Sequence, residues 1–155
     1  NMHNIGDDYP LYDDLKKYVY DAGKAAGAGD MAGTVLYNRG LYAAMLAVEA
    51  ARNAQKMSGK AEITAGDMRD GMEALEITEA RMSELGMPNF GPSFKVSCSN
   101  HGGEGLVAIQ QWDAKASSWK LISDFNPTDK DVIGKLIMED SAAYAAENKI
   151  NERCS

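Results

Sequence analysis

The sequence lacks the residue sets that most catalytic and metal sites need. It has two cysteines and two histidines in 155 residues, so a zinc site with four N or S ligands would have to combine His3, Cys98, His101 and Cys154, which argues against one. Neither histidine stands beside a Ser or Cys nucleophile in a known motif, and no GxGxxG or Walker spacing is present. We therefore predict no catalytic residues, no metal and no cofactor, and do not expect an enzyme.

Long apolar runs and basic clusters are also missing. Leu41–Ala51 is mostly Leu, Met, Val and Ala, but it contains Glu49 and is too short for a membrane span of about 20 apolar residues. A net charge of -7 without a local Lys/Arg cluster would repel a nucleic-acid backbone. No charged segment followed by an apolar one opens the sequence, so we expect no secretory signal in it, as in a mature or truncated chain.

With 45% hydrophobic and 25% charged residues, the chain fits one globular domain or part of a larger one. Apolar residues at three- and four-residue spacing predict several helices. We expect Leu41–Ala51 to be buried on most sides, because only Tyr42 and Glu49 interrupt its strong helix formers. The methionines at 68, 72, 82 and 87 are expected to pack in the core. The predicted helices are Tyr9–Ala26, a central helix within Gly33–Gln55, one capped by Thr64 and Asp67, Thr78–Leu85 and about Asp129–Asn148, with Gly23–Gly33 as a loop.

The pattern changes after Phe90. Phe94–Cys98 is predicted to be extended, while Leu106–Trp112 and Trp119–Phe125 predict an antiparallel hairpin around a short loop. Asn126 to Thr128 would then open the last helix. Taken alone, the chain is predicted to be α+β, helix-rich with a small antiparallel hairpin.

Three polar side chains lie at the start of the central helix. Tyr37, Asn38 and Arg39 offer a phenol, an amide and a guanidinium where unpaired backbone N–H groups favour anions. A ligand could be held here, with Tyr42 one turn further on. The alternative is that Arg39 pairs with a surface acid and Tyr37 belongs to the core.

The two cysteines leave two interpretations open. A bridge between Cys98 and Cys154 would close a loop of roughly 57 residues and stabilise the fold by on the order of 4 kcal/mol. Alternatively, they are unrelated thiols of a cytosolic protein.

Several segments, in their order and spacing, carry a resemblance to a known family. They are YNRG leading into MLAVEAARNAQ, then ITAGDMRDGMEAL, KVSCSNHGGEG, GLVAIQQWD and SAAYAAENKI. Together they resemble the C-terminal part of a branched-chain amino acid type periplasmic binding protein of ABC transporters. The resemblance implies a fragment of a two-lobed α/β protein, since such proteins are about twice this length or more.

The resemblance implies a division of the chain and a compartment. Residues 1–88 would be the helical part of one lobe, 89–104 the crossover, and 105–155 the hairpin and C-terminal helix of the other lobe. The location would be periplasmic, where Cys98 and Cys154 would form a disulfide. Tyr37, Asn38, Arg39 and Tyr42 would lie near the ligand cleft.

The implied function is the capture of a branched-chain or aromatic amino acid, or a related small carboxylate, for uptake. The partners would be this small-molecule ligand and the membrane permease of an ABC importer, without nucleic acid. Apolar faces left open in a fragment would favour a dimer or a segment swap. The alternative function is a free-standing helical protein-interaction module.

Overall fold

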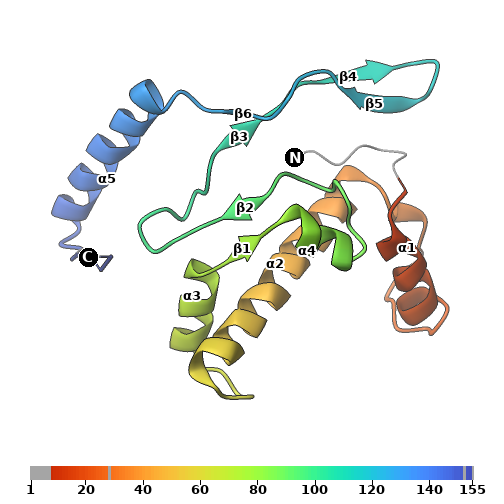
Figure 1. Cartoon of the computed structure of the whole chain (residues 1–155), viewed down its shortest axis with the longest axis horizontal. Coiled ribbons are helices and arrows are strands. Elements are labelled where there is room, and N and C mark those ends of the chain that lie inside the picture. Colours follow the sequence, from red (N-terminus) through yellow and green to blue (C-terminus); the bar gives the residue numbers. More distant parts are fainter. Residues whose placement is uncertain (1–7, 28, 152, 155) are drawn as a thin grey trace.

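The computed structural model describes residues 8–27, 29–151 and 153–154. His3 therefore lies outside the described residues. The chain forms a helical body followed by an extended antiparallel ribbon and a C-terminal helix, as Figure 1 shows. This agrees with the predicted helix-rich α+β class, although it does not confirm that the chain is a fragment of a binding protein.

The N-terminal helix is shorter than predicted. It consists of α1 (Pro10–Leu15) and a π-helical turn, η1 (Lys16–Tyr20), and stops well before Ala26. Gly23, with a φ of 66°, turns the backbone out of the helix in a conformation that few other residues adopt readily. The predicted loop follows and contains one short 3-10 turn, η2 (Gly29–Met31).

The central helix, α2 (Val35–Ser58), is the longest element, and Gly59 ends it in the left-handed conformation. The prediction that Leu41–Ala51 is buried on most sides is wrong. Val48 is 50% exposed, whereas Ala50 and Ala54 are fully covered by α3 and its surroundings. The described chain covers α2 on one side, so its opposite face stays open.

Two short helices follow, the first with its predicted cap. Thr64 and Asp67 form a reciprocal capping box at α3 (Ala65–Glu73), and Thr78 caps α4 (Glu79–Glu84). The strand β1 (Glu76–Ile77), which was not predicted, lies between them and pairs antiparallel with β2 (Phe94–Lys95). A β1 of two residues is too short to show a periodic pattern in the sequence.

The main core lies where these elements meet the N-terminal helix. Tyr9 and Phe90 pack edge to face with ring centroids 4.7 Å apart, and Tyr42 stacks on Phe90. The methionine prediction holds for Met82 and Met87, which are buried, but Met72 is 52% exposed. The other buried apolar members of this core are Ala50, Leu75 and Ile77.

The second half of the chain is an antiparallel ribbon in two parts. The predicted hairpin is present as β4 (Gln110–Asp113) and β5 (Ser118–Leu121), in which Trp112 faces Trp119. Nearer the helical body, β3 (Leu106–Val107) pairs with β6 (Asn126–Pro127). Asn126 and Pro127 thus belong to a strand and do not open the helix as predicted.

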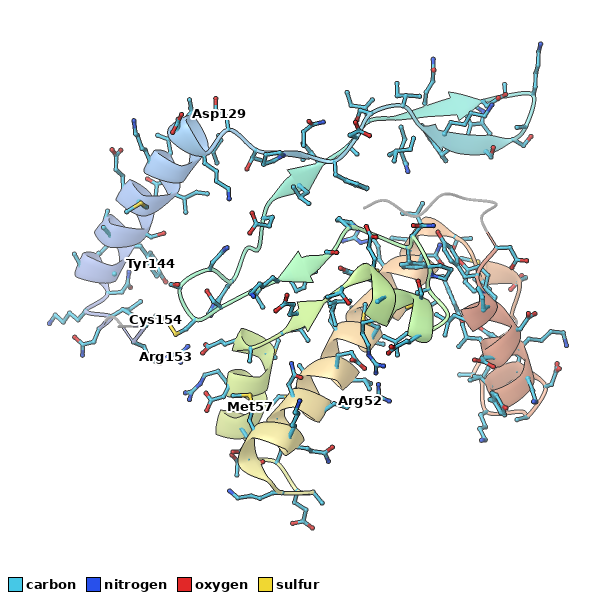
Figure 2. The ribbon with its side chains drawn as sticks, viewed as in Figure 1. Arg52, Met57, Asp129, Tyr144, Arg153 and Cys154 are labelled. Carbon is cyan, nitrogen blue, oxygen red and sulfur yellow. A yellow bond between two sulfur atoms is a disulfide. The ribbon has the colours of Figure 1, made fainter. Side chains whose placement is uncertain are left out.

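The chain ends in a helix that begins with a π turn. Asp129 caps η3 (Lys130–Gly134), and α5 (Lys135–Glu147) continues it. No residue of α5 is buried. In Figure 2, α5 stands apart from the helical body and its side chains project on several sides, while Arg153 and Cys154 lie back beside the turn after β2.

Candidate functional site

The four predicted ligand residues do not converge on one surface. The Asn38 side chain is fully buried, accepts a hydrogen bond from the Tyr12 hydroxyl at 2.7 Å and donates one to the carbonyl of Gly33 at 3.3 Å. These contacts connect α2 to α1, and they occupy both polar atoms of the Asn38 side chain with partners inside the protein. Arg39, the next residue, is exposed.

The two tyrosines also have neighbours within the protein. The hydroxyls of Tyr37 and Tyr20 lie 2.7 Å apart. Burial and this hydrogen bond raise the pKa of Tyr37 to about 12. Tyr42 is half-buried against Phe90, and burial raises its pKa as well. A ligand-binding role for these residues stays a prediction.

An apolar groove, which we call the α2–α3 groove, is the more prominent surface feature. It has a volume of about 630 Å³. One wall comes from α2, the other from α3, and the floor from the residues around β1 and β2. Small and flexible apolar side chains dominate it, which suits the packing of another apolar surface. The lining includes Leu46, Ala47, Met68, Met72, Phe94 and Val96.

Charged side chains lie at one edge of the groove. Glu73, at the end of α3, accepts from the Arg153 guanidinium through both carboxylate oxygens, one of them at 3.1 Å. His101 Nε2 lies 3.3 Å from the same carboxylate. The hydrogen bond from Arg153 is the main reason why the pKa of Glu73 is lowered. Glu73 and His101 both line the groove.

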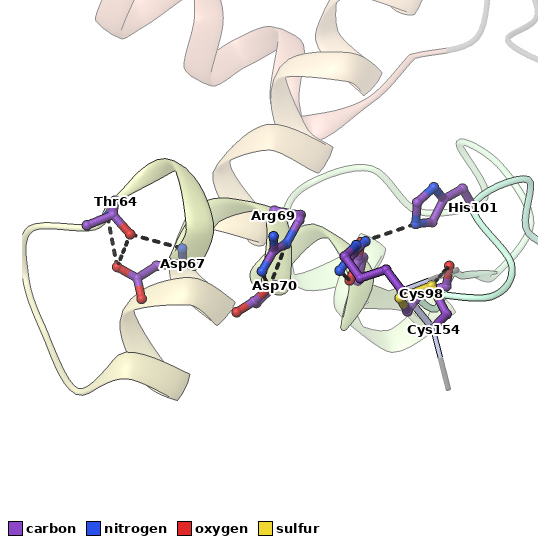
Figure 3. Close-up of polar contacts among 9 residues, drawn as sticks. Thr64, Asp67, Arg69, Asp70, Cys98, His101 and Cys154 are labelled. Atoms are coloured by element: carbon purple, nitrogen blue, oxygen red, sulfur yellow. Dashed lines mark hydrogen bonds and ion pairs between the residues drawn. A yellow bond between two sulfur atoms is a disulfide. The ribbon is translucent and has the colours of Figure 1, made fainter. Parts of the chain in front are cut away.

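The disulfide lies beside this cluster. Cys98 and Cys154 are joined, with Cα atoms 5.5 Å apart, so the structure forms the bridge that the resemblance implied. Figure 3 shows His101 and the two cysteines close to the end of α3. The described residues contain no group of three or more His, Cys, Asp and Glu side chains that could hold a metal ion.

A second charged group, which sequence reasoning missed, links α2 to α4. The Glu49 side chain is only 11% exposed and accepts from Arg81 at 2.8 and 3.0 Å, and Arg52 also contacts it. The hydrogen bond from Arg81 is the largest cause of the lowered pKa of Glu49. An acid inside an apolar run was the available signal, because a buried carboxylate needs a cationic partner.

The comparisons give one informative likeness. A solved structure, described as the crystal structure of an ABC transporter permease from the Pseudomonas fluorescens group, matches this chain with a TM-score of 0.82 and 37% sequence identity. The match covers 96% of this chain and 36% of that chain. The chain is thus similar to part of a protein of an ABC transporter. No protein-family model and no curated protein matches it.

This likeness corrects the identification drawn from the sequence. The matching structure is described as a permease, so the identification as the C-terminal part of a periplasmic binding protein is wrong, and so is the solute-capturing function that followed from it. The free-standing interaction module is not supported either, since the likeness lies within a longer chain. Within the described residues, no helix has both the length and the apolar character of a membrane span.

Proposed function

We propose that this chain is part of a component of an ABC transport system and acts in transport. The supporting observation is the likeness over 96% of the chain, at 37% identity, to a structure described as an ABC transporter permease. Because a shared fold does not by itself carry a function, the proposal needs a test on the chain itself.

We propose further that the C-terminal helix contacts another polypeptide of that system. Four apolar side chains of η3 and α5 are 44 to 62% exposed, and contiguous apolar surface of this kind usually marks a protein contact. We call Ile133, Leu136, Ile137 and Tyr144 the α5 apolar face.

A non-catalytic role in an oxidising compartment, such as the periplasm, completes the proposal. The Cys98–Cys154 disulfide favours an oxidising location, because reducing compartments keep thiols free. The α2–α3 groove favours packing over bond chemistry, since its lining is mainly aliphatic and aromatic.

The experiment is in-cell cross-linking of the affinity-tagged chain in its own host, followed by mass spectrometry. We expect a membrane-spanning subunit of an ABC transporter among the cross-linked partners. The double variant Leu136→Asp/Ile137→Asp should lower its recovery more than about tenfold, the effect of losing ~1.4 kcal/mol of binding free energy. Val48→Asp/Met57→Asp is the matched control, because these two residues are exposed to a similar extent but lie on α2.

Three results would count against the proposal. Recovery of no transporter subunit would overturn the transport role. Equal recovery with the double variant and with the control would overturn the role of the α5 apolar face. If the cross-linked partner were a second copy, and light scattering gave a dimer mass for the purified chain, the contact would be a dimer or a segment swap instead.

A further inference from the structure

Three segments that are distant in the sequence meet at the end of α3. They are Glu73 of α3, the turn of residues 97–103, which carries Cys98 and His101, and the chain end with Arg153 and Cys154. Consecutive residues of the chain end thus make two separate links, one covalent and one ionic. Cys154 is bridged to the turn after β2, as Figure 3 shows, and Arg153 contacts Glu73 at the end of α3.

The C-terminal helix depends on these links for its position. None of its residues is buried, and it packs mainly on η3, the turn that precedes it. On the N-terminal side of the helix, the pairing of β3 with β6 holds the chain. The Thr128 N–H extends this pairing by donating a hydrogen bond to the carbonyl of Gly105 at 3.2 Å. At its C-terminal side the disulfide and Arg153 hold it.

We propose that Cys98–Cys154, supported by Arg153–Glu73, is a redox-sensitive clamp that holds α5 and shapes one edge of the α2–α3 groove. A dithiol reductant opens the clamp by thiol–disulfide exchange. The S–S bond breaks, Cys98 and Cys154 each gain a proton and become thiols, and the two electrons come from the reductant, which becomes a disulfide. This proposal does not depend on the proposed role in transport.

The covalent link is the dominant part of the clamp. The Arg153 side chain is 46% exposed, and ion pairs with an exposed partner contribute little because water screens them. A disulfide between residues 56 positions apart removes many conformations that the open chain would otherwise sample. Reduction should therefore release the chain end even though the ion pair is still able to form.

The release reaches the groove because Glu73 of the clamp and His101 of the bridged turn both line it. His101 lies on the bridged turn, three residues after Cys98, and approaches Glu73 from that turn. The same turn is closed by hydrogen bonds between Ser97 and Asn100, each donating to the other at 3.1 Å. When Cys98 is released, these bonds lose the support of the chain end.

The test compares the oxidised protein with protein that has been reduced and alkylated under native conditions. Hydrogen exchange should be at least about tenfold faster at the amides of Ser97 and Asn100 after reduction. Small-angle X-ray scattering should show a larger radius of gyration, because α5 can move away from the body. The double variant Cys98→Ser/Cys154→Ser should reproduce both changes without a reductant.

The controls distinguish a disulfide that holds only the C-terminal region from one that stabilises the whole fold. The backbone amide of Asn38 should keep its exchange rate after reduction, because this residue lies in the core beside Tyr12. Oxidised Arg153→Ala should change the exchange of Ser97 by less than about threefold, since the bridge remains. Unchanged exchange and radius after reduction would overturn the proposal. Equal loss of protection at Asn38 would also overturn it, because the disulfide would then support the whole fold.

Discussion

Gly71 provides the most direct test of how α2 and α3 pack. It is buried in α3, and a Cβ atom built on it would lie 2.3 Å from the carbonyl oxygen of Ala50 and 2.7 Å from the backbone nitrogen of Ala54. Both contacts are far shorter than any real Cβ contact, and both atoms belong to the backbone of α2. No side-chain rotation can relieve them. Gly71→Ala therefore requires the two helices to separate.

Two opposing effects determine the size of the change. Alanine is favoured over glycine within a helix by roughly 0.5–1 kcal/mol. Overpacking a close contact typically costs about 1–3 kcal/mol, and rigid backbone atoms place this case at the upper end. We expect a net loss of about 1–3 kcal/mol in the free energy of unfolding. For a chain of this size, a loss of 2 kcal/mol would lower the Tm by about 4–8 °C.

The assay is urea unfolding followed by circular dichroism, with a control in the same helix. Gly66 also lies in α3, but its added Cβ would meet only the Thr64 hydroxyl, at an ordinary 3.6 Å. Gly66→Ala should leave the protein as stable as the wild type, or up to about 1 kcal/mol more stable. If Gly71→Ala proved as stable as Gly66→Ala, the close approach of α2 and α3 would be wrong.

Three further predictions concern polar contacts. Arg81→Met should cost about 1–2 kcal/mol in urea unfolding, because it leaves the buried Glu49 with one cation instead of two. Because the pKa of Glu49 is lower in the folded than in the unfolded protein, it stabilises the fold above the unfolded pKa, and this contribution is lost as the pH falls through the folded pKa. Arg81→Met should therefore lose less stability in acid than the wild type. Thr64→Ala should cost about 0.5–2 kcal/mol through the lost cap. Tyr20→Phe should lower the pKa of Tyr37 from about 12 towards 10, measured by ultraviolet titration.

Each of these has a result that would contradict it. Arg69→Met, which removes an exposed pair with Asp70, is the control for Arg81→Met, and equal losses would remove the special role of Glu49. Thr64→Ser should keep the stability that Thr64→Ala loses, and a failure to do so would exclude capping as the cause. An unchanged titration in Tyr20→Phe would show that Tyr20 does not affect Tyr37.

Helix ends with strong local signals were predictable from the sequence. Gly59 ends α2, Thr64 and Asp67 form the predicted box, and Thr78 caps α4. In each case, the backbone groups at the helix end are satisfied by residues within three or four positions. The tight turn between β4 and β5 is equally local, and the hairpin was predicted there.

Predictions that rested on apolar spacing alone were less successful. The N-terminal helix was drawn through to Ala26 because its apolar spacing continues, yet the chain turns at Gly23. The face of α2 that contains Val48 is as apolar as a buried face but is open. Periodicity shows which side of a helix could be buried, not whether another element arrives to cover it.

The sequence by itself determined the helix-rich class, the principal caps and the hairpin, because each follows from contacts between residues a few positions apart. Only the tertiary structure decided that Asn38 is buried under Tyr12, that Glu49 pairs with Arg81, and that Glu73, His101 and Arg153 meet beside the disulfide. These contacts join residues 26 to 80 positions apart. Nothing local specifies such pairs, since the path of the whole chain brings them together.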